Sequence, residues 1–159
     1  MKYSALVVTV SDRSFKGLRE DISGMKLLSL LSEGGYETSY EIVPDEESEI
    51  KKILLDYCDR KVNLILTTGG TGLAKRDVTP QATLSVAEKR VPGISELLRS
   101  ESMKKTPFGA LSRGESVVRG ETLIINLPGS PDAVCECYEV LQPMLIHAIK
   151  TILGEDTGH

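Results

Sequence analysis

Short apolar runs alternate with amphipathic stretches along the whole chain. Ala5–Val10 and Val62–Leu66 are almost wholly apolar, which is typical of strands buried on both faces. Tyr36–Val43 mixes Thr, Tyr, Ile and Val and also predicts a strand. Ile22–Ser32 is rich in Leu and predicts a helix. Gly34-Gly35 ends this helix, because glycine tolerates the left-handed conformation just past a helix end.

A further helix is predicted after Pro44. Its first turn carries Glu46, Glu47 and Glu49, and acids suit the positive start of a helix. Asp45 is a candidate cap for this helix. Its buried face is predicted from an i, i+3, i+4, i+7 stripe made of Ile50, Ile53, Leu54 and Tyr57.

The second half of the chain continues the alternation. Thr79-Pro80 predicts a helix start with Thr as the cap and Pro at the first position, and this helix runs to Ala87. Pro92-Gly93 interrupts it before another helix that begins with Ile94, Leu97 and Leu98.

A hairpin and a final helix complete the prediction. Ser116–Val118 and Thr122–Leu127 read as antiparallel strands that turn at Arg119-Gly120-Glu121. Ser130-Pro131 repeats the cap-then-proline start, and Ala133, Cys137, Leu141 and Leu145 line one face of the helix that follows. Because Pro143 lies within this helix, we expect a kink or a break there.

Strands that alternate with helices predict an α/β fold with a mostly parallel sheet covered on both faces. The 159 residues suffice for one domain with a proper core, and no internal repeat or long linker divides them. We expect a single domain over residues 1–154, followed by a polar tail over residues 155–159. Aromatic residues make up only 4% of the chain, so the core must be mostly aliphatic.

Composition excludes several classes of protein. A net charge of −4 argues against a general nucleic-acid binder, and no apolar run approaches the ~20 residues that span a bilayer. The N-terminus leads straight into a strand pattern and not a signal peptide, so we expect a cytoplasmic location. Cys58, Cys135 and Cys137 are odd in number and lack framework spacing, which indicates free thiols.

Candidate chemistry lies where predicted strands end. The four polar junctions are Ser11-Asp12-Arg13, Pro44-Asp45, Thr67–Gly72 and Asn126–Ser130. In an open α/β sheet, ligands bind beyond the carboxyl ends of the strands. All four junctions would meet at that edge, which predicts a site there.

The glycine loop Gly69-Gly70-Thr71-Gly72 offers clustered backbone N–H groups that a phosphate can approach closely. It lacks the Gly-Lys-Ser/Thr ending of a P-loop and does not follow the dinucleotide-binding pattern. A tight turn between strand and helix explains the glycines equally well when they are taken alone.

The charged residues around this loop extend the hypothesis. Lys75, Arg76 and Asp77 can hold a phosphate and a divalent cation together, although a solvated turn has the same composition. Asp45 and Asp77, at neighbouring strand ends, are the candidate ligands for Mg²⁺. Simpler alternatives remain for several other residues: Ser112-Arg113 as a surface loop, Ser130 as a helix cap and Asp12 as a turn former.

Thr67-Thr68-Gly69-Gly70-Thr71-Gly72, followed by Arg76-Asp77-Val78-Thr79-Pro80, resembles the signature of the MogA/MoaB molybdenum-cofactor proteins. Further matches are Val10-Ser11-Asp12-Arg13, Pro44-Asp45-Glu46, Leu111-Ser112-Arg113 and Asn126-Leu127-Pro128-Gly129-Ser130. They occur in order over nearly the whole chain and are specific as a set. The Arg-Asp-Val-Thr-Pro form favours the MogA type, whereas the short segment from Gly154 to His159 is closer to MoaB lengths.

The resemblance implies a three-layer α/β/α fold and a homotrimer, with a hexamer as the alternative. MogA-type members use Mg²⁺ and ATP to attach AMP to the terminal phosphate of molybdopterin, and a downstream partner then inserts molybdate. Carried over to this chain, the essential aspartates are Asp45 and Asp77. The glycine loop, Ser112 and Pro128-Gly129-Ser130 match pterin- and phosphate-binding positions, and Asp12 with its neighbours matches the nucleotide side.

Adenylyl transfer needs positioning and charge neutralisation more than a protein nucleophile, because the pterin phosphate is itself nucleophilic. Arg13, Lys75, Arg76 and Arg113 are therefore candidate counter-charges for the polyanions. Two other functions remain open at this point. One is a pterin-binding carrier or scaffold without catalysis, and the other is a general phosphometabolite-binding domain.

Overall fold

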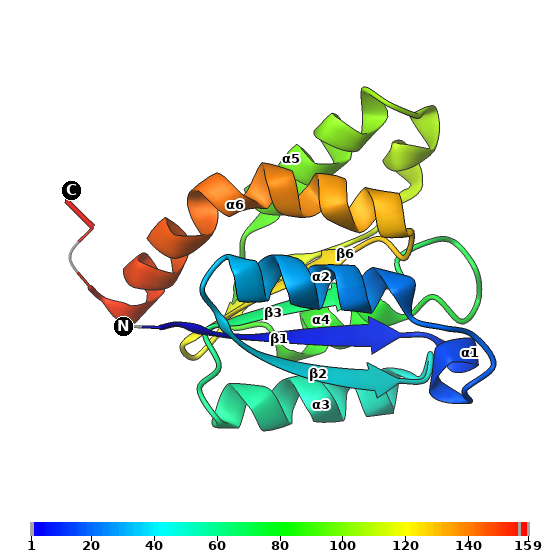
Figure 1. Cartoon of the computed structure of the whole chain (residues 1–159), viewed down its shortest axis with the longest axis horizontal. Helices are drawn as coiled ribbons and strands as arrows, with labels where there is room; N and C mark the ends of the chain where they lie inside the picture. Colours follow the sequence, from blue (N-terminus) through cyan, green and yellow to red (C-terminus); the bar gives the residue numbers. More distant parts are fainter. Residues whose placement is uncertain (1, 156, 159) are drawn as a thin grey trace.

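The computed structural model describes residues 2–155, 157 and 158, and the strands of this part form one six-stranded sheet in the order β2-β1-β3-β6-β5-β4 (Figure 1). The four parallel strands are β2 (Glu37–Val43), β1 (Ser4–Val10), β3 (Leu64–Thr68) and β6 (Thr122–Leu127). The antiparallel strands β5 (Ser116–Arg119) and β4 (Lys89–Arg90) complete the far edge. The mostly parallel sheet and the antiparallel hairpin are therefore confirmed.

Helices cover both faces of the sheet. One face carries α2 (Ile22–Glu33), α5 (Pro92–Met103) and α6 (Pro131–Leu153), and the other carries α3 (Glu47–Asp59) and α4 (Thr79–Val86). Figure 1 shows α2 and α6 on the side of the sheet opposite to α3. Two short elements lie in the connections: α1 (Asp12–Phe15) and the 3₁₀ helix η1 (Pro107–Leu111). The three-layer α/β/α prediction is confirmed.

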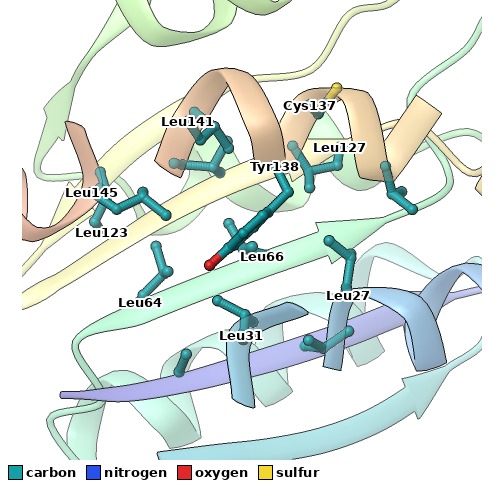
Figure 2. Packing of buried hydrophobic residues seen from close by; sticks show 14 of the residues in the cluster. Leu27, Leu31, Leu64, Leu66, Leu123, Leu127, Cys137, Tyr138, Leu141 and Leu145 are labelled. Atoms are coloured by element: carbon teal, nitrogen blue, oxygen red, sulfur yellow. The ribbon is translucent and has the colours of Figure 1, made fainter. Parts of the chain in front are cut away.

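Each central strand contributes to two aliphatic cores. Leu64 and Leu66 of β3 pack with α2 and α6, whereas Ile65 between them packs with α3 and α4. Successive side chains of a strand point to opposite faces, so an uninterrupted apolar run fills both layers. Figure 2 shows the first core, in which Leu27 from α2 and Leu141 from α6 approach β3 from the same side. Each fully buried Leu stabilises the fold by about 1.5–3 kcal/mol.

Several predicted boundaries were wrong. The third strand includes Thr67 and Thr68 and begins at Leu64, not Val62, because both threonines are buried and pair with β6. Asp12, for which a turn former was the simpler alternative, begins the single helical turn α1, and the Ser11 hydroxyl caps this turn. Of the kink or break expected at Pro143, the break is absent, because α6 continues to Leu153; Figure 1 shows the helix bending in its C-terminal half, in agreement with a kink.

Two predicted caps were also wrong. Helix α3 has Glu46 at its N-cap position, and the Asp45 carboxylate accepts a hydrogen bond from the backbone of Asp12 instead. Thr79 lies inside α4, and its hydroxyl donates to the Gly69 carbonyl. Both side chains therefore connect separate loops of the carboxyl edge, which no local pattern reveals.

The two ends of the described chain lie side by side. Tyr3 donates a hydrogen bond of 2.5 Å to Glu155, the first residue of the expected tail, while residues 156 and 159 of that tail lie outside the described part. Within residues 2–155, 157 and 158, no helix is long and apolar enough to cross a membrane, although α6 runs for 23 residues.

Connectivity opens a crevice beside β1. The chain leaves β1 towards α2 on one face and leaves β3 towards α4 on the other. Two neighbouring parallel strands whose following helices lie on opposite faces create a crevice at their carboxyl ends. This crevice separates the first and third of the predicted polar junctions.

Candidate functional site

A hollow of about 260 Å³ occupies the crevice, and we call it the acidic hollow. Each of the four junctions contributes to its lining, through Ser11, Asp45, Thr68 and Gly129 among others, and Asp77 lines it as well. Its lining comprises Thr9, Val10, Ser11, Ser14, Arg19, Glu20, Asp21, Ile22, Ser23, Asp45, Thr68, Gly69, Gly70, Asp77, Gly129 and Pro131. The prediction that these junctions converge on one sheet edge is therefore confirmed.

A second hollow of about 320 Å³ lies between α5, η1 and the start of α6, and we call it the α5 hollow. It contains Ser112, Pro128 and Ser130 from the predicted site. Its lining comprises Ser95, Leu98, Arg99, Ser102, Thr106, Phe108, Gly109, Ser112, Gly114, Asn126, Pro128, Ser130, Ala133 and Cys137. Apolar groups and hydroxyls dominate this lining.

The segment Pro128–Pro131 separates the two hollows. Pro128 and Ser130 line the α5 hollow, whereas Gly129 and Pro131 line the acidic hollow. An extended chain turns successive residues to opposite sides, which accounts for this alternation. The two hollows therefore adjoin the same short segment from opposite sides.

Two glycines shape the wall of the acidic hollow. Gly69 and Gly70 have φ angles of 99° and 69°, a region that residues with a side chain rarely adopt. A Cβ on Gly69 would lie 2.4 Å from the Val10 carbonyl, and one on Gly70 would lie 2.3 Å from the Thr79 hydroxyl. The glycines are therefore needed both for the tight turn and for an open wall, so the two interpretations of this loop are compatible.

Asp12 and Asp45 bind each other's backbone. Asp12 N donates to Asp45 Oδ2 at 2.8 Å, and Asp45 N donates to Asp12 Oδ1 at 2.9 Å. The Arg76 guanidinium donates two hydrogen bonds, of 2.6 and 2.9 Å, to the Asp12 carboxylate. These bonds from Arg76 lower the pKa of Asp12 to about 2, and the bond from Asp45 N adds to the effect. Three loops of the carboxyl edge are thereby tied together.

The surroundings of Asp45 disfavour the ionised form of its carboxyl group. Burial is the main cause that raises its pKa, and the negative charges of Asp12 and Asp77 raise it further. The hydrogen bond from Asp12 N and the charge of Arg76 oppose this shift. A cation bound nearby would relieve the same penalty, because opposite charge favours the ionised carboxylate.

Asp77 is oriented by its own loop. Its Oδ2 accepts a hydrogen bond of 3.0 Å from Ala74 N, and its backbone N donates to Ala74 O at 3.0 Å. Among the described residues, the second carboxylate oxygens of Asp45 and Asp77 accept no hydrogen bond. Two carboxylates, each with one oxygen free of hydrogen bonds from the described residues, therefore line one hollow. Asp45 follows β2 and Asp77 follows β3, and β1 lies between these strands, so the expectation of neighbouring strand ends was wrong.

These two carboxylates suit Mg²⁺ better than a metal ion whose ligands must all come from protein side chains. Within the described part of the chain, no group of three or more His, Cys, Asp or Glu side chains is arranged to hold a metal ion. Mg²⁺ usually keeps several waters and binds one or two carboxylates together with substrate phosphates. The donor set that Asp45 and Asp77 offer has this composition.

Arg113 was expected as a counter-charge or a ligand-binding residue, but its guanidinium contacts the protein backbone. It donates to Gly72 O at 2.8 Å and to Asp77 O at 2.6 Å. Arg13 and Lys75 are exposed, and neither is among the described residues that line the two hollows. Ser130 caps α6 as expected, and Thr68 donates to Pro128 O at 2.7 Å.

Several residues that line the hollows were missed by the sequence analysis, and three of them are polar or aromatic groups that a ligand could contact. Asp21 caps α2 and accepts hydrogen bonds from Thr9 and Tyr40, and its position before an apolar helical run was a usable capping signal. Arg99 donates to Gly114 O at 2.9 Å and is the one charged residue among those lining the α5 hollow. Phe108 is 74% exposed at the same hollow. Nothing in the local pattern marks Arg99 or Phe108.

Fold and site together define a doubly wound α/β protein with a candidate ligand site at a switch point of the parallel sheet. The chain belongs to the family described as "Probable molybdopterin binding domain", which it matches over residues 6–147.

The chain is similar to several known proteins over most of its own length and most of theirs. The chain is 45% identical over 152 residues to a protein named molybdopterin adenylyltransferase from Helicobacter pylori (strain J99), covering 93% of this chain and 86% of the relative. It is 40% identical over 138 residues to the protein of the same name from Escherichia coli (strain K12), covering 84% and 70%. The crystal structure of the molybdopterin biosynthesis enzyme MoaB from Thermus thermophilus superposes with a TM-score of 0.90 at 46% identity, covering 96% of this chain and 98% of that chain.

Proposed function

We propose that this protein is a molybdopterin adenylyltransferase, which transfers AMP from ATP to the terminal phosphate of molybdopterin and releases pyrophosphate. The observation that carries the proposal is the pair of hollows on either side of Pro128–Pro131. A transferase for two large substrates needs two adjoining compartments and a shared position where the reacting groups meet. Relatives named molybdopterin adenylyltransferase at 40–45% identity support the assignment.

The two hollows suit different parts of the substrates. The α5 hollow offers apolar surface with several hydroxyls, which fits a bicyclic pterin that has hydrogen-bonding edges. The acidic hollow offers the glycine loop and two aspartates, which fits a triphosphate accompanied by a cation. We place the phosphate of the pterin at Pro128-Gly129-Ser130, where the two compartments adjoin.

The chain's own groups bind and orient the substrates. Gly69 and Gly70 let phosphate oxygens approach the backbone, and Ser11 at the end of β1 faces the same hollow. Asp45 and Asp77 would hold Mg²⁺, which when bound neutralises phosphate charge and polarises the phosphorus. The three free cysteines are not needed as nucleophiles, and burial raises the pKa of Cys137 to about 11, which keeps its thiol protonated.

The proposal extends to the context of the reaction. We propose a homotrimer, with a hexamer as the alternative, and delivery of the adenylylated pterin to a downstream molybdate-insertion protein. A cytoplasmic location, without nucleic-acid or membrane partners, belongs to the same proposal. Sedimentation velocity tests the oligomer directly.

The decisive experiment is a pyrophosphate-release assay with molybdopterin and ATP, run with Mg²⁺ and with Mg²⁺ removed by chelation. We expect release that requires all three components. A pterin-binding scaffold without catalysis is the second candidate, supported by the family description, which names binding and no reaction. Binding of molybdopterin without any pyrophosphate release would establish this second function and exclude the first.

A further inference from the structure

The loop from Gly70 to Asp77 is held mainly by contacts with other segments of the chain. Leu73 is 68% exposed, and Ala74, Lys75 and Arg76 are exposed as well. Within the loop, the described hydrogen bonds join only Ala74 and Asp77. Its position relative to the sheet is therefore decided by contacts from other segments.

Arg113, which follows η1, makes three hydrogen bonds to this loop. The two bonds from Arg76 to Asp12 and the bond from Thr79 N to Gly70 O are the other described hydrogen bonds between the loop and the rest of the protein. The Arg113 guanidinium donates to Asp77 O at 2.6 Å and to Gly72 O at 2.8 Å, and its backbone N donates to Thr71 O at 2.9 Å. A third guanidinium nitrogen donates to Gln81 Oε1 at 3.3 Å, which connects the loop to α4. The planar fork thus spans the beginning and the end of the loop.

We infer that Arg113 is a positioning residue that acts through Asp77. Asp77 lines the acidic hollow, and its carboxylate direction follows from the position of its main chain, to which Arg113 is hydrogen-bonded. The rigid guanidinium fixes two carbonyls at once, whereas a lysine ammonium is a single flexible point charge. The effect on catalysis rests on the proposed function, but the effect on the loop does not.

The chain provides a matched control in Arg119. It is half-buried like Arg113 and also donates to a backbone carbonyl, Val86 O at 3.1 Å, but at the opposite end of α4. We would compare Arg113→Ala, Arg113→Lys and Arg119→Ala. All three variants alter one arginine that binds the backbone, so a general cost in stability appears in each.

The first measurement is the exchange rate of the Asp77 backbone amide, which donates to Ala74 O. We expect Arg113→Ala to speed up exchange at Asp77 by at least about tenfold, Arg113→Lys to lie between it and the wild type, and Arg119→Ala to leave it unchanged. Equal exchange at Asp77 in the Arg113→Ala and Arg119→Ala variants would overturn the inference, whether or not the protein is an adenylyltransferase.

The second measurement separates positioning from direct ligand binding. In the pyrophosphate-release assay, we expect Arg113→Ala to lower kcat by about 100-fold, the cost of displacing a functional group by about 1 Å, while the Kd for molybdopterin is retained. Arg113→Lys should recover part of kcat, and Arg119→Ala should keep it. A higher KM for ATP with kcat unchanged would show instead that Arg113 binds the nucleotide. Absence of turnover in the wild type would refute the proposed function and leave the exchange result to decide the role of Arg113.

Discussion

The two hollows differ most in charge. Among the described residues, the acidic hollow is lined by four carboxylates and one guanidinium, so its lining has a net negative charge; the groups belong to Glu20, Asp21, Asp45, Asp77 and Arg19. Arg99 is the charged residue among those that line the α5 hollow. A polyanion is repelled by the first lining unless a cation accompanies it, but an uncharged ring system is not repelled by the second. We therefore expect that ligand binding in the acidic hollow depends on a metal ion and that ligand binding in the α5 hollow does not.

The largest expected effect comes from Asp77→Ala. Loss of this carboxylate removes a proposed metal ligand, so pyrophosphate release should fall by about 100-fold or more while the Kd for molybdopterin is retained. Asp132→Ala, which removes an exposed acid outside both linings, serves as the control. Undiminished turnover in Asp77→Ala would contradict the metal role, and equal losses in turnover and pterin binding would contradict the separation of the two hollows.

Asp45→Asn should separate activity from stability. We expect a loss of pyrophosphate release of about tenfold or more, together with a higher free energy of unfolding in urea at pH 7, because a half-buried charge is removed. The folded-state pKa of Asp45 is raised, mainly by burial, so the wild-type destabilisation is present above that pKa and disappears as the pH falls through it.

The gain in stability of Asp45→Asn should therefore shrink towards acidic pH. A variant that is less stable than the wild type at neutral pH would show that the Asp12–Asp45 hydrogen bonds outweigh the cost of burying the charge.

Phe108→Ala tests the other side of the comparison. If the exposed ring contacts the pterin, its removal should raise the KM for molybdopterin by about tenfold and leave the KM for ATP unchanged, since an aromatic contact to a base is worth about 1–3 kcal/mol. Leu111→Ala, another exposed apolar residue of η1 that lies outside the hollow lining, is the control. A shift in the KM for ATP would place the pterin in the acidic hollow instead.

Arg76→Ala should have the smallest effect on stability. Arg76 is largely exposed, and exposed ion pairs contribute little. The ion pair holds the pKa of Asp12 near 2, below its ordinary value of 3.8, so its contribution is present above about pH 4 and disappears as the pH falls towards 2. Urea unfolding from pH 7 to pH 2 checks this, and a wild-type advantage that grows towards pH 2 would be opposite in sign to the expectation.

Much of the fold could be predicted because its causes are local. The apolar runs at Ala5–Val10 and Thr122–Leu127 are buried on both faces in the structure, as their composition requires. The errors in the predicted elements occurred where a polar residue has a hydrogen-bond partner far away in the sequence. Thr67 resembled a loop residue, but the Asn126 amide donates to its hydroxyl in the interior, which makes burial in β3 acceptable.

By itself, the sequence determined the alternation of strands and helices, the aliphatic core and the four polar junctions that meet at the carboxyl edge. Hydrophobic periodicity and turn chemistry act over a few residues, so they can be read along the chain.

Only the tertiary structure decided what individual polar side chains do. Asp45 receives the backbone N–H of Asp12 instead of capping a helix, and Arg113 holds the loop of Asp77 instead of facing an open ligand site. Hydrogen-bond partners 33 and 36 residues away become neighbours only when the sheet brings its loops to one edge.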